Sequence, residues 1–266
     1  MIENYYFLLK PFIAVLVLSF LYSILGIFVI LKKLSFFSDG IAHASIFSLA
    51  LAYFLNLDLV LLGIIGAIFF SSLIFFLERK TKLHADALIG LIFVTFLSLG
   101  IILMSFKRGY QPELLNFFIG NILTLSSFDF YLILFFSLVI FLVLIKFFQI
   151  FILVFLDRTE AILRGFNVNL YEFIFYLILA IATILGIKIT GVVLITALLI
   201  LPPMSASFIS KNFKELLVFS PLLGCLNIIS GFLLSFGFNL PLSASIIAFS
   251  ASVFFLLFFF NLFKTK

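Results

Sequence analysis

The chain has 266 residues, a net charge of +5 and a mean hydropathy of +1.42, and 65% of its residues are hydrophobic while only 10% are charged. Soluble domains are about half apolar and about a quarter charged, so this composition predicts an integral membrane protein. It argues against soluble enzymes, nucleic-acid-binding proteins and disulfide-stabilised secreted domains. The single cysteine, Cys225, has no second cysteine in the chain with which to form a disulfide.

The apolar residues fall in stretches long enough to cross a lipid bilayer. A helix satisfies its own backbone in lipid and needs about 20 apolar residues to span the membrane. The sequence therefore predicts an all-α polytopic bundle of eight or nine transmembrane helices, with residues 1–266 forming one membrane domain. Two runs nearly fuse at Gly186–Thr190. In segment 110–127 the apolar run from Leu114 to Leu125 is too short to span, so we expect this segment to dip into the interface. The stretches lie at 11–31, 36–56, 59–77, 87–106, 128–150, 171–187, 189–210, 215–236 and 241–263.

The basic residues are distributed unevenly between the two sides of the predicted bundle. Twelve of the 16 Lys and Arg residues fall on one side and four on the other. Cytoplasmic loops carry an excess of Lys and Arg, which predicts that segments 32–35, 78–86, 151–170 and 211–214 and the C-terminus are cytoplasmic. With nine spans, the N-terminus then lies outside.

Asp39 and His43 are ionisable residues inside the second apolar stretch. They stand at positions i and i+4 and so share one helix face, among small residues that let neighbouring helices approach. An ionisable residue within a span is costly and marks a functional site. A carboxylate oxygen and an imidazole nitrogen make half of a four-coordinate divalent metal site, which a second copy of the chain would complete across a two-fold axis. The alternative is structural: an Asp–His hydrogen bond, or an Asp39 cap near the cytoplasmic end.

Motifs for other chemistries are absent from the sequence. It contains no His-Glu-x-x-His for a metalloprotease, no Gly-x-Ser-x-Gly for a serine nucleophile and no P-loop for ATP. The other histidine, His84, lies in a basic loop, where we expect it to be solvated. We therefore expect neither enzymatic activity nor a permanently bound cofactor.

A short polar segment separates the fifth and sixth apolar stretches. Asp157 can cap a helix with Glu160 three residues later, as in a capping box, and Arg164 and Gly165 suit its end. These residues predict a two-turn cytoplasmic helix, which is either a simple connector or a docking helix for a partner subunit. We expect the preceding apolar segment, 147–156, to lie at the membrane surface.

Two adjacent prolines, Pro202 and Pro203, lie late in another apolar stretch. They lack backbone donors, and we expect them to break the helix locally. Ser205 and Ser207 are then candidates to hydrogen-bond the freed carbonyls. Together with Gly191 earlier in the stretch, the prolines form either a fixed kink or the hinge of a gate.

Together these features resemble the permease subunit of bacterial zinc and manganese ABC importers, over essentially the whole chain. The likeness rests on four elements of that family: Asp-x-x-x-His-Ala, acidic-Ala-x-x-x-Gly, Gly-x-x-Leu-x-x-x-Leu-Leu-Ile-x-Pro, and Asp-x-x-x-Gly at the start of the fourth span. The matching residues are Asp39, His43 and Ala44; Glu160, Ala161 and Gly165; Gly191, Leu194, Leu198, Leu199, Ile200 and Pro202; and Asp86 and Gly90. The family's usual Pro-Ala-Ala-Thr-Ala is replaced here by Pro202-Pro203-Met204-Ser205-Ala206.

The resemblance implies a homodimeric permease in the bacterial inner membrane. In that family two permease chains form the pathway, a cytoplasmic ATPase dimer drives transport, and an extracytoplasmic binding protein delivers the metal. By the same resemblance Asp39 and His43 line the metal path, and the segment from Glu160 to Gly165 docks in the ATPase.

The zinc branch of the family is favoured over the manganese branch. Ala42-His43-Ala44-Ser45, Leu77-Glu78 and Lys188-Ile189-x-Gly191 are similar to zinc permeases, and Ile46-Phe47-Ser48 replaces the Leu-Pro-Gly that is more frequent in manganese relatives. The alternatives are manganese or iron import by the same mechanism, and a proton- or sodium-coupled secondary carrier. A membrane enzyme acting on lipid or peptide is disfavoured because no catalytic constellation is present.

Overall fold

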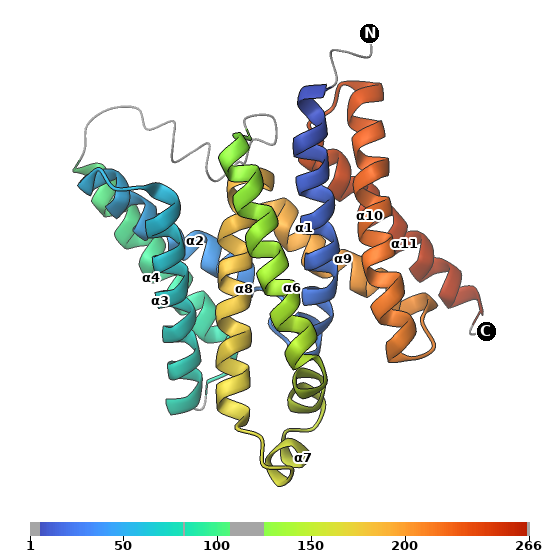
Figure 1. Ribbon diagram of the computed structural model, residues 1–266, viewed down its shortest axis with the longest axis horizontal. Helices are drawn as coiled ribbons and strands as arrows, with labels where there is room; N and C mark the ends of the chain where they lie inside the picture. The colour runs from blue at the N-terminus through green and yellow to red at the C-terminus, as the bar shows by residue number, and fades with distance from the viewer. Residues whose placement is uncertain (1–5, 82, 107–124, 265–266) are drawn as a thin grey trace. The chain divides into compact units, whose positions relative to one another are not determined.

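A computed structural model describes residues 6–81, 83–106 and 125–264, and its regular elements within these ranges are all α-helices (Figure 1). Within this part of the chain, nine helices are long and apolar enough to cross a membrane, which agrees with the upper value expected from the sequence. The remaining helix, α7, has six residues and is too short to cross a membrane. The helices are α1 (Tyr6–Leu31), α2 (Phe37–Leu55), α3 (Leu59–Lys80), α4 (Ala85–Ser105), α6 (Ser127–Leu156), α7 (Arg158–Leu163), α8 (Val168–Thr190), α9 (Val192–Ile209), α10 (Phe213–Phe238) and α11 (Leu242–Lys264).

The chain forms two compact units, neither of which is continuous in sequence. The first contains α1, the start of α6, and nearly all of α9 with α10 and α11, and the second contains α2, α3, α4, the rest of α6, α7 and α8. The organisation of residues 1–266 as one membrane domain stays a prediction. The first unit comprises Met1–Ser35, Ile122–Ser137 and Val193–Lys266, and the second comprises Phe36–Asn121 and Leu138–Val192.

In the second unit α2 lies at the centre of its neighbours and packs against α3, α4 and α8. Small residues make these approaches close. A Cβ atom on Gly40 would lie 2.3 Å from Cγ2 of Ile89 in α4, and one on Gly66 of α3 would lie 2.4 Å from Oγ of Ser48 in α2. The expectation that small residues draw neighbouring helices onto α2 is confirmed.

In the first unit α10 packs against both α1 and α11. Ser220 of α10 donates a hydrogen bond of 2.8 Å to the main-chain carbonyl of Ser23 in α1. One turn later, a Cβ atom on Gly224 would lie 2.1 Å from Oγ of Ser23. The α1–α10 contact therefore depends on small residues on both helices, as is common where helices associate without a hydrophobic driving force.

The expected break at the two prolines is wrong, because α9 continues through Pro202 and Pro203 to Ile209. The missing donor of Pro203 frees the carbonyl of Leu199, and this oxygen lies 1.9 Å from where a Cβ atom on Gly26 of α1 would stand. The glycine lets the freed carbonyl meet a Cα–H group instead. The predicted serine partners do not act there.

Ser207 donates its hydroxyl to the carbonyl of Met204 at 2.7 Å, so it does not satisfy a carbonyl that the prolines free. The buried hydroxyl of Ser205 has no hydrogen-bond partner among the described residues. Gly26 of α1, and not a serine hydroxyl, therefore contacts the freed carbonyl of Leu199.

The apolar segment 147–156 continues α6 and does not form a separate surface segment, which corrects the sequence expectation. At about 1.5 Å per residue, the 30 residues of α6 rise about 45 Å, against about 30 Å for the hydrocarbon core of a bilayer. The last turns pack on the start of α8, where the rings of Phe151 and Phe175 lie 5.8 Å apart. The predicted interfacial segment 110–127 lies, apart from its last three residues, outside the described residues.

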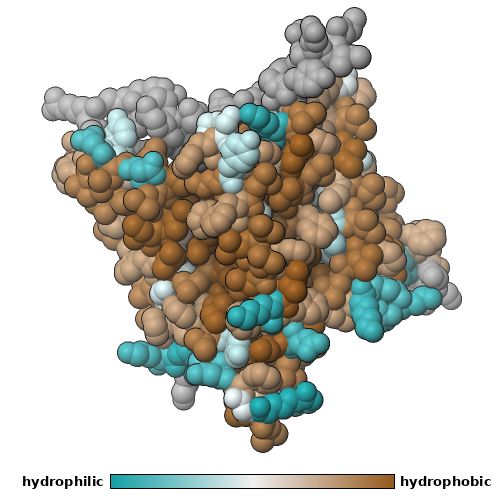
Figure 2. Space-filling model, in the orientation of Figure 1, coloured by the Kyte–Doolittle hydropathy of each residue, from teal (hydrophilic) through white to brown (hydrophobic). Residues whose placement is uncertain are grey.

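The face of the protein drawn in Figure 2 follows the expected pattern of a membrane bundle. Hydrophobic side chains cover the flanks of the helices, and hydrophilic side chains gather toward the helix ends (Figure 2). The exposed apolar flanks are the surfaces that a lipid bilayer would cover.

Replacing Gly26 with alanine is expected to destabilise the protein by about 1–3 kcal/mol, because its Cβ atom would meet a backbone oxygen that cannot move aside easily. Thermal unfolding of the detergent-purified protein measures the effect. The matched control is Gly237→Ala, because a Cβ atom there meets nothing within 4 Å. Equal unfolding temperatures for the two variants would contradict the role given to Gly26.

Candidate functional site

Asp39 and His43 lie on one face of α2, with Asp39 in its first turn. His43 Nδ1 lies 3.6 Å from Asp39 Oδ1, and the two side chains are 29% and 41% exposed, respectively. A carboxylate in the first turn of a helix is stabilised by the helix dipole. The pair is therefore both held in place and accessible.

Two contacts fix the orientation of the His43 ring. Its Nδ1 lies 2.8 Å from the main-chain carbonyl oxygen of Asp39, and its ring packs edge-on against Phe93 of α4 at 4.9 Å. In the tautomer that donates from Nδ1 to this carbonyl, Nε2 carries the lone pair that a metal ion requires. The main chain of α2 thus sets the ring nitrogen that is presented as a ligand.

Of the two structural alternatives raised by the sequence, the hydrogen bond between the two residues is present, but it runs to the main chain of Asp39 and not to its carboxylate. The Nδ1–Oδ1 separation of 3.6 Å is longer than a hydrogen bond, and Nδ1 meets the carbonyl oxygen of Asp39 instead. The N-cap of α2 is Phe36, with no side-chain capping hydrogen bond, so Asp39 does not cap the helix.

The start of α2 is tied to α8 immediately before the pair. The hydroxyl groups of Thr183 and Ser38 form a hydrogen bond of 3.0 Å, and the ring of Phe37 packs edge-on against Tyr176 at 5.1 Å. Within the described ranges, no three His, Cys, Asp or Glu residues gather closely enough to hold a metal ion. The Asp39–His43 pair therefore offers two protein ligands.

The predicted short helix is confirmed as α7. Asp157 Oδ1 accepts a hydrogen bond of 2.9 Å from the Glu160 main-chain N–H. The helix ends at Leu163 with Arg164 as its C-cap, and Gly165 follows with φ of +82°, a conformation that favours glycine. The second half of the capping box is not formed, since Glu160 forms an ion pair with Arg164 instead.

One face of α7 packs inward and another is exposed. Ala161 is fully buried in a small cluster with Val154 of α6 and Val168 of α8. Leu163 is 82% exposed, and Ile162 beside it is also exposed. The helix therefore presents apolar side chains outward while it stays anchored to the second unit.

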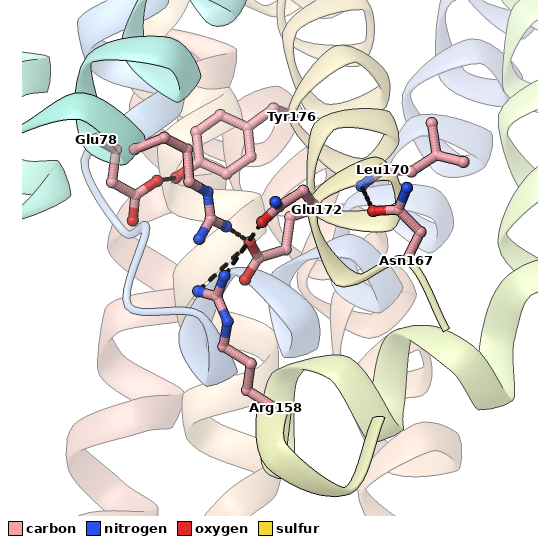
Figure 3. Close-up of polar contacts among 8 residues, drawn as sticks. Glu78, Arg158, Asn167, Leu170, Glu172 and Tyr176 are labelled. Carbon is pink, nitrogen blue, oxygen red and sulfur yellow. Dashed lines mark hydrogen bonds and ion pairs between the residues drawn. The ribbon is translucent and has the colours of Figure 1, made fainter. Parts of the chain in front are cut away.

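A buried carboxylate, Glu172, lies in α8 next to the start of α7, and it was not among the residues predicted from the sequence. Its side chain in α8 is 2% exposed and forms an ion pair with Arg79 of α3. Arg158 of α7 reaches toward the same carboxylate, with Nη1 4.0 Å from Oε2, as Figure 3 shows. One turn along α8, Tyr176 donates a hydrogen bond of 2.7 Å to Glu78 Oε2. The available signal was an acidic residue inside the predicted span 171–187.

Gly191 is the C-cap of α8 and has φ of +77°. The chain passes from the second compact unit to the first between Val192 and Val193, one residue after Gly191. With ψ of 165°, its backbone lies in a region that only glycine adopts readily. The predicted hinge residues therefore differ in their position relative to the helices: Gly191 follows the end of α8, whereas Pro202 and Pro203 lie inside α9.

A family model for the ABC 3 transport family matches residues 4–261. The chain belongs to this family. The resemblance to ABC importer permeases is thereby confirmed, and the ATPase of such a transporter is a separate chain. The permease and its relatives match over nearly their full lengths.

Three relatives illustrate the likeness of the permease to known proteins. The manganese import system permease protein ScaB of Streptococcus gordonii is 28% identical, over 97% of this chain and 92% of that protein. The high-affinity zinc uptake system membrane protein ZnuB of Buchnera aphidicola subsp. Schizaphis graminum is 30% identical, over 92% and 94%. The solved structure of PsaBC from Streptococcus pneumoniae in complex with Fab matches with a TM-score of 0.82 and 26% identity, over 97% and 95%.

Substituting Asp157 with alanine in the permease is expected to loosen α7, because the Glu160 N–H loses its capping acceptor. Loss of an N-cap costs about 1 kcal/mol, which corresponds to about fivefold faster local amide exchange. Hydrogen–deuterium exchange of the peptide covering residues 157–165 measures the change. Asp157→Asn keeps an acceptor and is the control, and unchanged exchange in Asp157→Ala would show that the cap does not stabilise α7.

Proposed function

We propose that this chain is the permease subunit of an ATP-driven importer of a divalent metal ion, most specifically zinc. The observation that supports this function is the accessible Asp39–His43 pair at the start of the central helix α2, in a chain of the ABC 3 transport family. The pair combines two side chains that bind borderline divalent cations in proteins.

Two copies of the permease are proposed to share the metal. One copy supplies one carboxylate and one imidazole, and a two-fold axis through the pathway brings together two of each. Two nitrogens and two oxygens complete the four-coordinate arrangement that zinc prefers. The homodimer therefore follows from the number of ligands in the pair and from the number that the metal takes.

Ligand chemistry favours zinc as the cargo. Imidazole suits zinc well, whereas manganese prefers sites made of carboxylate, carbonyl and water oxygens. Manganese is the second candidate, because ScaB, which is 28% identical, is named a manganese import permease, while ZnuB, at 30%, is named for zinc. A direct competition between the two ions decides between them.

Energy is proposed to come from a cytoplasmic ATPase dimer that binds α7. The exposed Ile162 and Leu163 offer an apolar contact, and the Glu160–Arg164 ion pair holds the outer face of this short helix. An extracytoplasmic binding protein would deliver the metal on the opposite side of the membrane. In this proposed arrangement, α7 and the C-terminus lie on the cytoplasmic side of a bacterial inner membrane.

The transport cycle follows from these assignments. Metal leaves the binding protein, pauses between the two Asp39–His43 pairs and is released inward as ATP binding and hydrolysis move the two permeases. Gly191 is the proposed pivot, because its backbone conformation and its place at the boundary between the units suit a change of direction. Pro202 and Pro203 are proposed to stiffen α9 beyond that pivot.

The combined substitution Asp39→Ala and His43→Ala is expected to lower ATP-dependent metal uptake by at least about 100-fold, since loss of even outer-shell partners lowers metal affinity by about 10–100-fold. Uptake is measured in vesicles that contain the permease, its ATPase and its binding protein. His84→Ala, at the exposed N-cap of α4, is the matched control and should keep wild-type uptake.

The same vesicles identify the metal when zinc and manganese are offered together. Zinc is expected to enter ahead of manganese. A preference for manganese would change the cargo and keep the mechanism, whereas uptake that ignores the double substitution would show that Asp39 and His43 are structural.

A further inference from the structure

We propose that the ion cluster formed by Arg158 and Arg79 around the buried carboxylate of Glu172 is the joint through which α7 moves the metal-binding end of α2. These are positioning residues, because none of them is placed at the metal. The inference rests on the proposed function in one respect, namely that α7 is the helix on which the ATPase acts.

The cluster connects three helices through one carboxylate. Glu172 of α8 is 2% exposed, and Arg79 comes from the last turn of α3 while Arg158 begins α7. A buried carboxylate is costly unless a positive partner and hydrogen bonds satisfy it. The two arginines therefore hold α3 and α7 against α8 at one place.

Arg158 is the part of the joint that belongs to α7. Its Nη2 donates a hydrogen bond of 3.1 Å to Asn169 Oδ1, and its Nη1 lies 4.0 Å from Glu172 Oε2. The planar guanidinium thus contacts two successive turns of the α8 surface with two of its nitrogens. A helix of six residues has little stability of its own, so these contacts and the burial of Ala161 determine how α7 sits on α8.

A second contact carries the connection from α8 to α2. Tyr176 lies one turn after Glu172, and its hydroxyl donates to Glu78 of α3 at 2.7 Å (Figure 3). The ring of the same tyrosine packs against Phe37 at 5.1 Å. Phe37 stands two residues before Asp39 on α2, so a displacement of α8 at Glu172 reaches the metal ligands through packed side chains.

The charges in this region allow the joint to be tested without unfolding the protein. Two carboxylates, Glu78 and Glu172, balance two guanidinium groups, Arg79 and Arg158. Arg158 is 48% exposed, and Glu172 keeps its partner Arg79 when Arg158 is removed. An Arg158→Gln variant therefore detaches α7 from the cluster and leaves no buried charge without a partner.

The experiment measures metal ions transported per ATP hydrolysed, in vesicles holding the full complex and supplied with zinc. Arg158→Gln is expected to lower this ratio about five- to tenfold, within the range of coupling found between distant sites. The ATPase should still co-purify with the variant, and ATP hydrolysis should continue. Arg158→Lys keeps the positive charge and is expected to restore most of the ratio.

Lys80→Gln is the matched control, because it also removes one positive charge from an exposed residue, next to Arg79, and should keep the wild-type ratio. A wild-type ratio in Arg158→Gln would overturn the joint, and so would loss of ATPase binding in that variant, because Arg158 would then act in docking. Wild-type vesicles that accumulate neither zinc nor manganese with ATP would overturn the proposed function and this inference together.

Discussion

Water is absent from the hydrocarbon region of a bilayer, so each polar group within a span needs a partner inside the protein. Several hydroxyl groups in the spans meet this constraint by donating to the main chain of the preceding turn, whereas the buried hydroxyl of Ser205 has no partner among the described residues. Ser23 donates to the carbonyl of Ser19, Ser45 to that of Ile41 and Thr183 to that of Leu179, each at 2.7 Å. The constraint also governs the charged side chains, since Glu172 lies in α8 only where Arg79 and Arg158 meet it.

The features of the fold that are local in sequence were predictable. Apolar length gives the spans, and Asp157 and Gly165 mark the two ends of α7, because capping depends on neighbours within a few residues. The prolines were misinterpreted, since the partner that compensates them, Gly26, stands more than 170 positions earlier and its approach depends on tertiary packing. The length of α6 was likewise underestimated, because the apolar composition of segment 147–156 is equally compatible with a segment at the membrane surface and with the end of a long helix.

The candidate site also has features that the sequence predicts and features that depend on tertiary packing. Asp39 and His43 share a face because their spacing matches a helical turn, and that much follows from the sequence. The carbonyl contact of His43 Nδ1 and the packing of Phe93 against the ring need coordinates, because each depends on a side-chain rotamer or on another helix. The Arg79–Glu172 pair joins residues 93 positions apart, so no local sequence pattern predicts it.

The length of α6 has a mechanical consequence for the helix that follows it. Residues 127–137 of α6 belong to one compact unit and residues 138–156 to the other, and α7 begins two residues after its last residue. A rod about 45 Å long that tilts by about 10° about one end moves its other end by about 8 Å. A tilt of about 10° in α6 would therefore displace α7 by about 8 Å.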